Sequence, residues 1–176
     1  PIRKIALSRY AMHALAARPE LESETDPARG ARAPFGAEEM AQALHGSDGD
    51  DEAAFKQRLR RLRQRVLLRT MARDLEGLAG LAEVCATTSE LADASIRAAL
   101  RWLREEELVV VAMGKLGGGE LNVSSDVDLV FLYPEEGETA GPRRISNREF
   151  FERLGRRVIA ALHEVTAHGF VFRVDM

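Results

Sequence analysis

Along the first part of the chain, hydrophobic positions recur every three or four residues, which is the spacing of one face of a helix. Helices are therefore predicted over three ranges, 2–17, 37–44 and 52–75. Residues 22–36 carry prolines, glycines and many charges, and this composition predicts a loop. A short helix should begin at 79–84, and Thr88 or Ser89 should cap a further helix that runs towards Glu107.

The pattern changes after Leu108, where apolar and β-branched residues gather in short runs that are typical of strands. Strands are predicted over three ranges, 109–112, 127–133 and 170–176. The second run is apolar on both faces, so we expect a central and buried strand. Between the second and third strands, Ser146 or Asn147 should cap a helix that reaches about His168 and ends at Gly169.

This order of elements, a helical segment followed by strand, strand, helix and strand, is typical of an α+β fold. We predict a helical amino-terminal arm over 1–105 and a core with a small mixed sheet over 106–176. In the third strand, the two-residue repeat should place Val171, Arg173 and Asp175 on one face.

The predicted helix over 52–75 combines an apolar stripe with a dense run of arginines. The arginines expected outside that stripe are Arg58, Arg60, Arg61, Arg63, Arg65 and Arg69. Such a run can bind phosphate or an acidic partner, or it can form a solvated face with local ion pairs.

The composition of the chain limits the classes of protein to which it can belong. With 176 residues, 45% of them hydrophobic, the chain is long enough to form a substantial core. A net charge of −3 argues against a general nucleic-acid-binding surface. No apolar run is long enough to span a membrane, and the single Cys85 fits the reducing cytoplasm. Because the chain begins at Pro1 without a methionine and ends in an apolar run, we expect it to be part of a longer protein.

Two aspartates at the start of the second predicted strand are the strongest chemical signal. Asp126 and Asp128 are spaced i, i+2, so their carboxylates should share one face of the strand. Neighbouring like charges repel unless a cation or proton lies between them, and Mg²⁺ prefers carboxylate oxygens together with substrate phosphates. An Asp-x-Asp pair alone can also mark a solvated edge or turn. Here the glycine-rich segment just upstream favours nucleotidyl or phosphoryl transfer.

Six residues of the preceding loop are candidates to contact nucleotide phosphates: Lys115, Gly117, Gly118, Gly119, Ser124 and Ser125. The glycines can expose backbone N–H groups to a triphosphate, or they can simply form a tight turn. The lysine can neutralise a phosphate or lie at the surface, and the serines can bind phosphate or orient the loop. This is not a P-loop, because the lysine precedes the glycines.

The run Gly-Lys-Leu-Gly-Gly-Gly-Glu-Leu-Asn-x-Ser-Ser-Asp-x-Asp resembles the signature of the glutamine synthetase adenylyltransferases, in the DNA polymerase β-like nucleotidyltransferase superfamily. Residues 59–75 and 89–93 resemble helices of that family, and the final Phe-Arg-Val-Asp-Met resembles its third catalytic segment. A two-metal site usually needs a third carboxylate from another strand, and Asp175 is the candidate, although it can also be an ordinary strand-end residue. The resemblance favours Asp126, Asp128 and Asp175 as joint ligands of Mg²⁺.

The resemblance also implies a reaction. The family adds AMP from ATP to a tyrosine of glutamine synthetase, and removes it with phosphate to release ADP. Residues 113–122 are more similar to the amino-terminal, adenylyl-removing half. Glutamine synthetase, the nitrogen-signalling PII protein, ATP or ADP and phosphate are the implied partners, with no nucleic acid and no membrane. Adenylylation from ATP, another nucleotidyltransferase of the superfamily, or a non-enzymatic regulatory domain are the alternatives.

Overall fold

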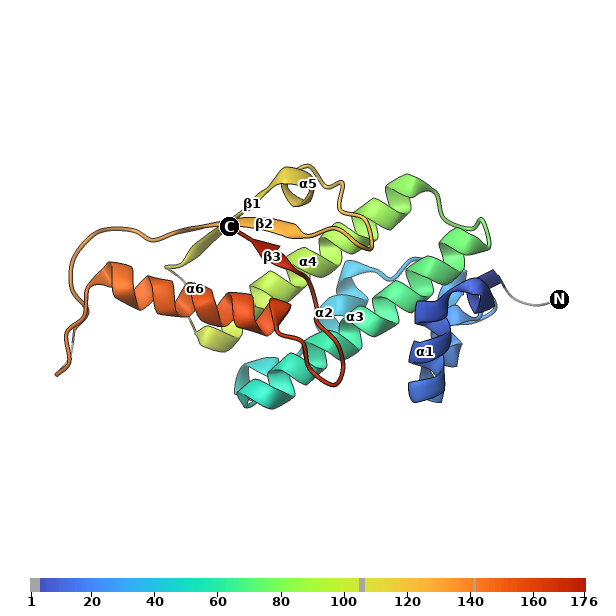
Figure 1. Ribbon diagram of the computed structural model, residues 1–176, viewed down its shortest axis with the longest axis horizontal. Helices are drawn as coiled ribbons and strands as arrows, with labels where there is room; N and C mark the ends of the chain where they lie inside the picture. The colour runs from blue at the N-terminus through green and yellow to red at the C-terminus, as the bar shows by residue number, and fades with distance from the viewer. Residues whose placement is uncertain (1–3, 105–106, 141) are drawn as a thin grey trace.

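A computed structural model describes residues 4–104, 107–140 and 142–176 of the chain (Figure 1). Its α-helices are α1 Arg9–Ala17, α2 Ala37–Ala43, α3 Glu52–Leu75, α4 Leu81–Leu103, α5 Gly114–Gly117 and α6 Asn147–His163. Its strands are β1 Val109–Met113, β2 Val127–Leu132 and β3 Val174–Asp175. Short 3-10 helices cover Lys4–Leu7, Pro19–Thr25, Gly30–Arg32 and Ser47–Gly49. The predicted α+β class is confirmed, whereas the predicted boundary between residues 105 and 106 lies outside the described residues.

Two helices that start at a local cap, α3 and α6, were predicted to begin where they do. The Asp51 side chain accepts a hydrogen bond from the backbone N–H of Ala54 at 2.8 Å, and α3 begins at the next residue after this cap. Ser146 caps α6 in the same way, by accepting from the N–H of Glu149 at 3.1 Å. In both cases the side-chain oxygen satisfies an N–H group that has no partner inside the helix.

The predicted break before residue 88 was wrong, because α4 continues without interruption from Leu81 to Leu103. The hydroxyl of Thr88 donates to the carbonyl oxygen of Val84 at 2.8 Å, one turn earlier in the same helix. A threonine bonded in this way fits the interior of a helix and does not cap a new one. The amino-terminal prediction was also inaccurate. Ser8 caps α1, so the predicted helix over 2–17 divides into a 3-10 turn and α1.

The chain after α6 differs from the prediction. Helix α6 ends at His163, and Gly169 lies in a later turn with a φ of 82°. The third strand is shorter than expected, because the N–H groups of Val171 and Phe172 donate to the carbonyl of Leu162, at 2.8 and 3.1 Å, instead of pairing with β2. Val171 is buried and does not share an exposed face with Asp175.

The three strands form one mixed sheet in the order β1-β2-β3. Strand β1 pairs antiparallel with β2, and β2 pairs parallel with β3. Figure 1 shows this sheet lying along α4 and α6, and its inner face joins the main hydrophobic core through Val127, Leu129 and Val174. Strand β2 is central as predicted, but it is buried on one face only, since Asp128, Val130 and Leu132 are exposed.

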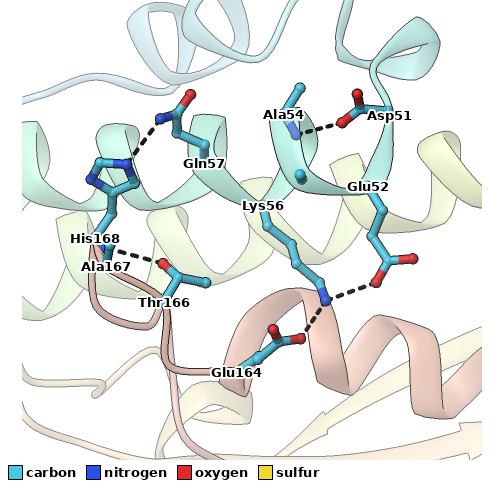
Figure 2. A pocket seen from close by; sticks show the side chains of 10 residues that line it. Asp51, Glu52, Ala54, Lys56, Gln57, Glu164, Thr166, Ala167 and His168 are labelled. Atoms are coloured by element: carbon cyan, nitrogen blue, oxygen red, sulfur yellow. Dashed lines mark hydrogen bonds and ion pairs between the residues drawn. The ribbon is translucent and has the colours of Figure 1, made fainter.

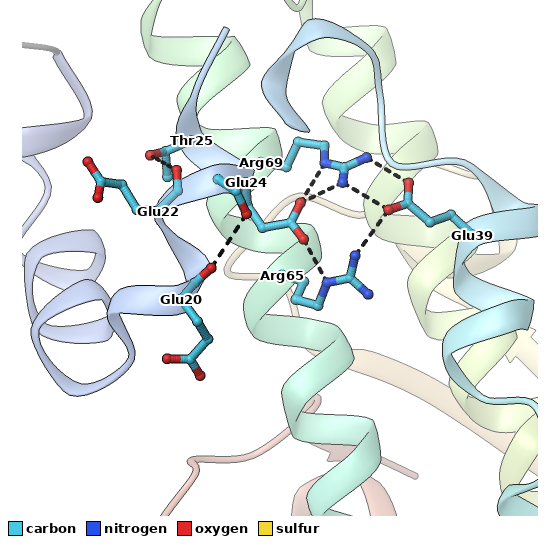
Figure 3. Close-up of polar contacts among 8 residues, drawn as sticks. Glu20, Glu22, Glu24, Thr25, Glu39, Arg65 and Arg69 are labelled. Atoms are coloured by element: carbon cyan, nitrogen blue, oxygen red, sulfur yellow. Dashed lines mark hydrogen bonds and ion pairs between the residues drawn. The ribbon is translucent and has the colours of Figure 1, made fainter. Parts of the chain in front are cut away.

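Two of the six arginines predicted to lie outside the apolar stripe of α3, Arg60 and Arg69, are buried, whereas Arg61 is exposed. Arg69 is 8% exposed and lies between two carboxylates, with Nη2 at 2.5 Å from Oε2 of Glu24 and Nη1 at 2.7 Å from Oε2 of Glu39 (Figure 3). Arg65 joins the same pair of glutamates. Glu24 belongs to the 3-10 helix within the predicted loop over 22–36. These arginines therefore tie the amino-terminal segments to α3, and this part of the predicted solvated face is buried.

The main core runs through both halves of the chain. It includes Phe55 and Leu59 of α3, Leu91 of α4, Leu129 of β2 and Leu162 of α6 in one cluster of buried residues. The sheet and α6 are thus fixed directly against the helices that precede them. Among the described residues, no helix combines the length and apolar character needed to cross a membrane.

Candidate active site

The candidate site begins with two carboxylates on neighbouring strands. Asp128 of β2 and Asp175 of β3 occupy the same register position in the parallel pair, and both side chains are exposed. Each follows a buried valine, Val127 and Val174, which face the core side by side. Side chains at matching register positions of adjacent strands point to the same face of the sheet. The exposed face therefore carries Asp128 and Asp175 next to each other.

The third predicted aspartate, Asp126, forms an ion pair with Arg173. The Nε of Arg173 donates to Oδ1 of Asp126, and its Nη2 lies 3.4 Å from the carbonyl oxygen of Ser124. The backbone is held in the same place, because the N–H of Val127 donates to the carbonyl of Arg173 at 2.9 Å. Asp126 and Arg173 thus form an ion pair two positions before the Asp128–Asp175 pair.

The chemistry of these side chains fits a divalent cation such as Mg²⁺. Asp128 and Asp175 offer oxygen ligands on one face, and neither carboxylate forms a hydrogen bond or ion pair with the other described residues. Within the described ranges, however, no group of three or more His, Cys, Asp or Glu side chains is arranged to hold a metal ion. Asp126 would have to release the guanidinium of Arg173 before it could bind a metal. The three-carboxylate site therefore stays a prediction.

The glycine-rich loop adopts a helical turn rather than a simple loop between strands. Gly114 begins α5 directly after β1 and has a φ of 52°, in the left-handed region that favours glycine. A β-carbon at Gly114 would overlap with the carboxylate of Asp128, and one at Gly117 would lie 2.7 Å from the carbonyl oxygen of Ala112. Both positions therefore need glycine so that the turn can pack against β1 and β2.

Two of the predicted phosphate-binding glycines use their N–H groups within this turn. The N–H of Gly118 donates to the carbonyl of Gly114 at 3.1 Å, and that of Gly119 donates to the carbonyl of Leu116 at 3.0 Å. The side chain of Lys115 is exposed and forms no hydrogen bond or ion pair with the other described residues, which leaves its ammonium group free. The backbone carbonyl of Lys115 accepts from the N–H of Glu120 at 2.8 Å. A role for these residues in phosphate binding stays a prediction.

The two predicted serines form hydrogen bonds within the turn that leads to Asp126. The hydroxyl of Ser124 donates to the side-chain oxygen of Asn122 at 3.0 Å, and Ser125 Oγ accepts from the N–H of Asn122 at 3.2 Å. This turn is linked to α4, because Ser89 Oγ accepts from the N–H of Leu121 at 3.3 Å. Among the described contacts the serines therefore orient the loop, which was one of the two predicted roles.

Two residues of this region were not predicted as part of the site. The guanidinium of Arg173 contacts Asp126, and Gly114 limits the space around Asp128. The two-residue repeat of the third strand predicted that Arg173 lies on the same face as Asp175, so the sequence did contain a signal for Arg173. Gly114 is the first residue of the glycine-rich run that resembles the family signature, but its contact with Asp128 was not predictable, because that contact depends on how α5 folds back over β2.

A pocket of about 630 Å³ lies away from these residues, between the start of α3 and the turn after α6 (Figure 2). It is lined by none of the predicted site residues. Figure 2 shows Lys56 between Glu52 and Glu164, and Gln57 beside the ring of His168. The contact with Lys56 lowers the pKa of the Glu164 carboxyl. Burial acts to lower the pKa of Lys56, but hydrogen bonds to both glutamates outweigh it and raise that pKa.

Comparison with known proteins identifies relatives along the whole chain. A family model described as glutamate–ammonia ligase adenylyltransferase matches residues 2–176. Bifunctional glutamine synthetase adenylyltransferase/adenylyl-removing enzymes from Nitrosomonas eutropha and Nitrosomonas europaea are each 49% identical over 96% of the chain. The enzyme of that name from Chromobacterium violaceum is 45% identical over 99% of the chain. The match covers 20% of the first two relatives and 21% of the third, so the chain spans about a fifth of their length.

Proposed function

The chain belongs to the glutamate–ammonia ligase adenylyltransferase family, and we propose that it carries a nucleotidyl-transfer site that removes AMP from the adenylylated tyrosine of glutamine synthetase. Glutamate–ammonia ligase is glutamine synthetase by its reaction, and the relatives are named for both adding and removing the adenylyl group. The observation that carries the proposal is the placement of Asp128 and Asp175 side by side on the exposed face of the sheet.

In the proposed reaction, an oxygen of inorganic phosphate attacks the phosphorus of the tyrosine-bound AMP. The new P–O bond makes ADP, while the bond between phosphorus and the tyrosine oxygen breaks. The phenolate that leaves then takes up a proton. The attacking phosphate becomes the β-phosphate of ADP, so atoms and charge balance without an oxidant or a further co-reactant.

Mg²⁺ held by these carboxylates would neutralise charge on the phosphate oxygens and align the attacking and leaving oxygens. Asp128 and Asp175 are the residues proposed to hold it, with Asp126 as the third ligand. Arg173 supplies positive charge beside Asp126, and the exposed Lys115 directly follows Gly114, which packs against Asp128. The packing of Gly114 against Asp128 restricts where that carboxylate can point.

Product analysis with the full-length protein tests this proposal. Adenylylated glutamine synthetase is incubated with Mg²⁺ and phosphate, and the released nucleotide is identified. Phosphorolysis releases ADP, hydrolysis releases AMP, and the transferase direction consumes ATP and releases pyrophosphate. An Asp128→Asn variant should release no ADP. Release of pyrophosphate with unmodified glutamine synthetase, without ADP from the modified form, would assign the chain to the adenylylating activity.

Adenylylation is retained as the second candidate, because the relatives' name includes it and both directions need the same metal ligands. A PII signalling protein as regulator remains a prediction of the family resemblance. So does a cytoplasmic location, which the single Cys85 fits through the redox state of that compartment. Glutamine synthetase is the proposed protein substrate.

A further inference from the structure

We infer that His163, the last residue of α6, is a positioning residue that holds β3 and thereby sets the place of the Asp175 carboxylate. This inference rests on the proposed function, since it concerns the metal site assigned there. The ring nitrogen Nδ1 of His163 accepts a hydrogen bond from the backbone N–H of Val174 at 3.1 Å. Val174 lies between Arg173 and Asp175, so the bond acts at the centre of the segment that bears both side chains.

Apart from this bond, β3 is held by the packing of Val174 in the core, by its pairing with β2 and by the ion pair of Arg173 with Asp126. It consists of two residues, and among the described strands it pairs with one neighbour, β2. The carbonyl of Arg173 faces β2, where it accepts from the N–H of Val127. Successive N–H groups of a strand point to opposite edges, so the N–H of Val174 points away from β2. His163 satisfies this outer edge, which otherwise presents an unpaired donor.

The backbone around His163 is held to α3 by the buried side chain of Arg60. Arg60 of α3 is 0% exposed, and its guanidinium donates to the carbonyls of Ala161 at 2.9 Å and of Gly169 at 2.8 Å, and also to that of Glu164. Ala161 and Glu164 flank the histidine on either side of the helix end. Because a buried side chain with three such acceptors cannot move freely, the backbone at His163 is fixed to α3.

The same helix end also holds the chain just before β3. The carbonyl of Leu162 accepts from the N–H groups of Val171 and Phe172. Together with His163, these contacts form a continuous connection from α3 through the end of α6 to Val174. Removing the acceptor on His163 leaves the earlier contacts intact but releases the last one, immediately before Asp175.

Three substitutions separate this role from a general structural one. His163→Leu and His163→Ala remove the hydrogen-bond acceptor. In His163→Asn the amide oxygen is bonded to Cγ, as Nδ1 is in histidine, so it can still accept the hydrogen bond from Val174. His45→Leu is the matched control, because His45 is also exposed and its side chain forms no hydrogen bond with other described residues. His163 is exposed, so the variants are expected to fold, which melting curves verify.

The measurements use the full-length protein and Mn²⁺ as the metal probe. Deuterium exchange, read by mass spectrometry on a peptide that contains residues 171–176, reports the protection of the Val174 amide. We expect His163→Leu and His163→Ala to lose that protection and to bind Mn²⁺ roughly three- to tenfold more weakly, in line with the loss of one hydrogen bond. His163→Asn should restore both properties, and His45→Leu should match the wild type.

Unchanged Mn²⁺ affinity in His163→Leu and His163→Ala overturns the inference, whatever the exchange shows. Equal loss in His163→Asn also overturns it, because the retained acceptor should then have sufficed. Neither measurement requires turnover. A wild type that releases no ADP would therefore contradict the proposed function alone, while the response of the variants would still decide the role of His163.

Discussion

Gly114 packs directly against the carboxylate of Asp128, with no space for a β-carbon between its backbone and the side-chain oxygens. Gly114 lies at the end of β1 and Asp128 near the start of β2, at neighbouring positions of the antiparallel pair. The glycine therefore forms one wall around the aspartate. This contact fixes where the carboxylate lies before any metal binds.

Replacement of Gly114 by alanine should move the Asp128 carboxylate and lower activity by roughly tenfold or more, since small misplacements of reacting groups are costly. The positive φ of 52° adds a backbone penalty of about 1–2 kcal/mol to folding. Steady-state kinetics and thermal unfolding measure the two effects. Gly49→Ala is the control, because nothing lies within 4 Å of a β-carbon there. Normal activity in Gly114→Ala would refute the restricting role of this glycine.

Asp128→Asn should abolish turnover while the protein stays folded. Asp128 is exposed and has no ion-pair partner among the described residues, so loss of its charge removes no stabilising contact. The loss of a metal-ligating charge should lower the rate by roughly a hundredfold or more. Single-turnover kinetics at several Mg²⁺ concentrations, with circular dichroism as a check of folding, test this expectation. Activity near that of the wild type would contradict a metal site at this aspartate.

Arg69→Ala should destabilise the protein by about 3–5 kcal/mol, because it leaves Glu24 buried without its closest cation. The Glu24 side chain is 7% exposed, and both of its carboxylate oxygens are bonded to arginines. Urea unfolding followed by circular dichroism measures the loss. Arg148→Ala is the matched control, since its pair with Glu152 on α6 is exposed and should contribute about 0–1 kcal/mol. Similar losses in the two variants would show that the buried network contributes little.

Several features set by local sequence were predictable, although the Ser8 cap at the start of α1 was missed. The caps at Asp51 and Ser146 depend only on residues within one turn of each helix, and both helices begin where expected. Alternation along the chain likewise indicated that Arg173 and Asp175 share a side of the third strand. The short reach of these interactions makes their sequence signals reliable.

Features that depend on distant partners were not predictable. The burial of Arg69 follows from Glu24 and Glu39, which lie 45 and 30 residues away along the chain. Nothing in the local pattern of α3 indicates them. The early end of α6 at His163 depends in the same way on Arg60, whose guanidinium takes up carbonyls at the helix end. From the sequence alone, a helix with buried arginines therefore cannot be distinguished from a helix whose arginines face solvent.

The ion pair between Glu164 and Lys56 predicts a pH dependence of stability. Lys56 lowers the pKa of Glu164 in the folded protein below the value of about 4.3 that a glutamate has in an unfolded chain. A lowered carboxyl pKa contributes stability that is fully present above the unfolded pKa. That contribution is lost as the pH falls through the folded pKa, where the carboxylate becomes protonated.

Replacement of Glu164 by glutamine removes this charge, so the variant should be less stable than the wild type at pH 7. The difference in the free energy of unfolding should shrink below about pH 4.3 and vanish at still lower pH, once Glu164 is protonated in the wild type. Urea unfolding between pH 7 and pH 3 measures this difference. Glu152→Gln is the control for a glutamate that pairs with exposed arginines of α6, and it should show a smaller difference at pH 7. A constant difference across the range would mean that the Glu164 charge is not its source. Helix α6 would then be held at its end by Arg60, whose contacts with backbone carbonyls do not titrate in this range.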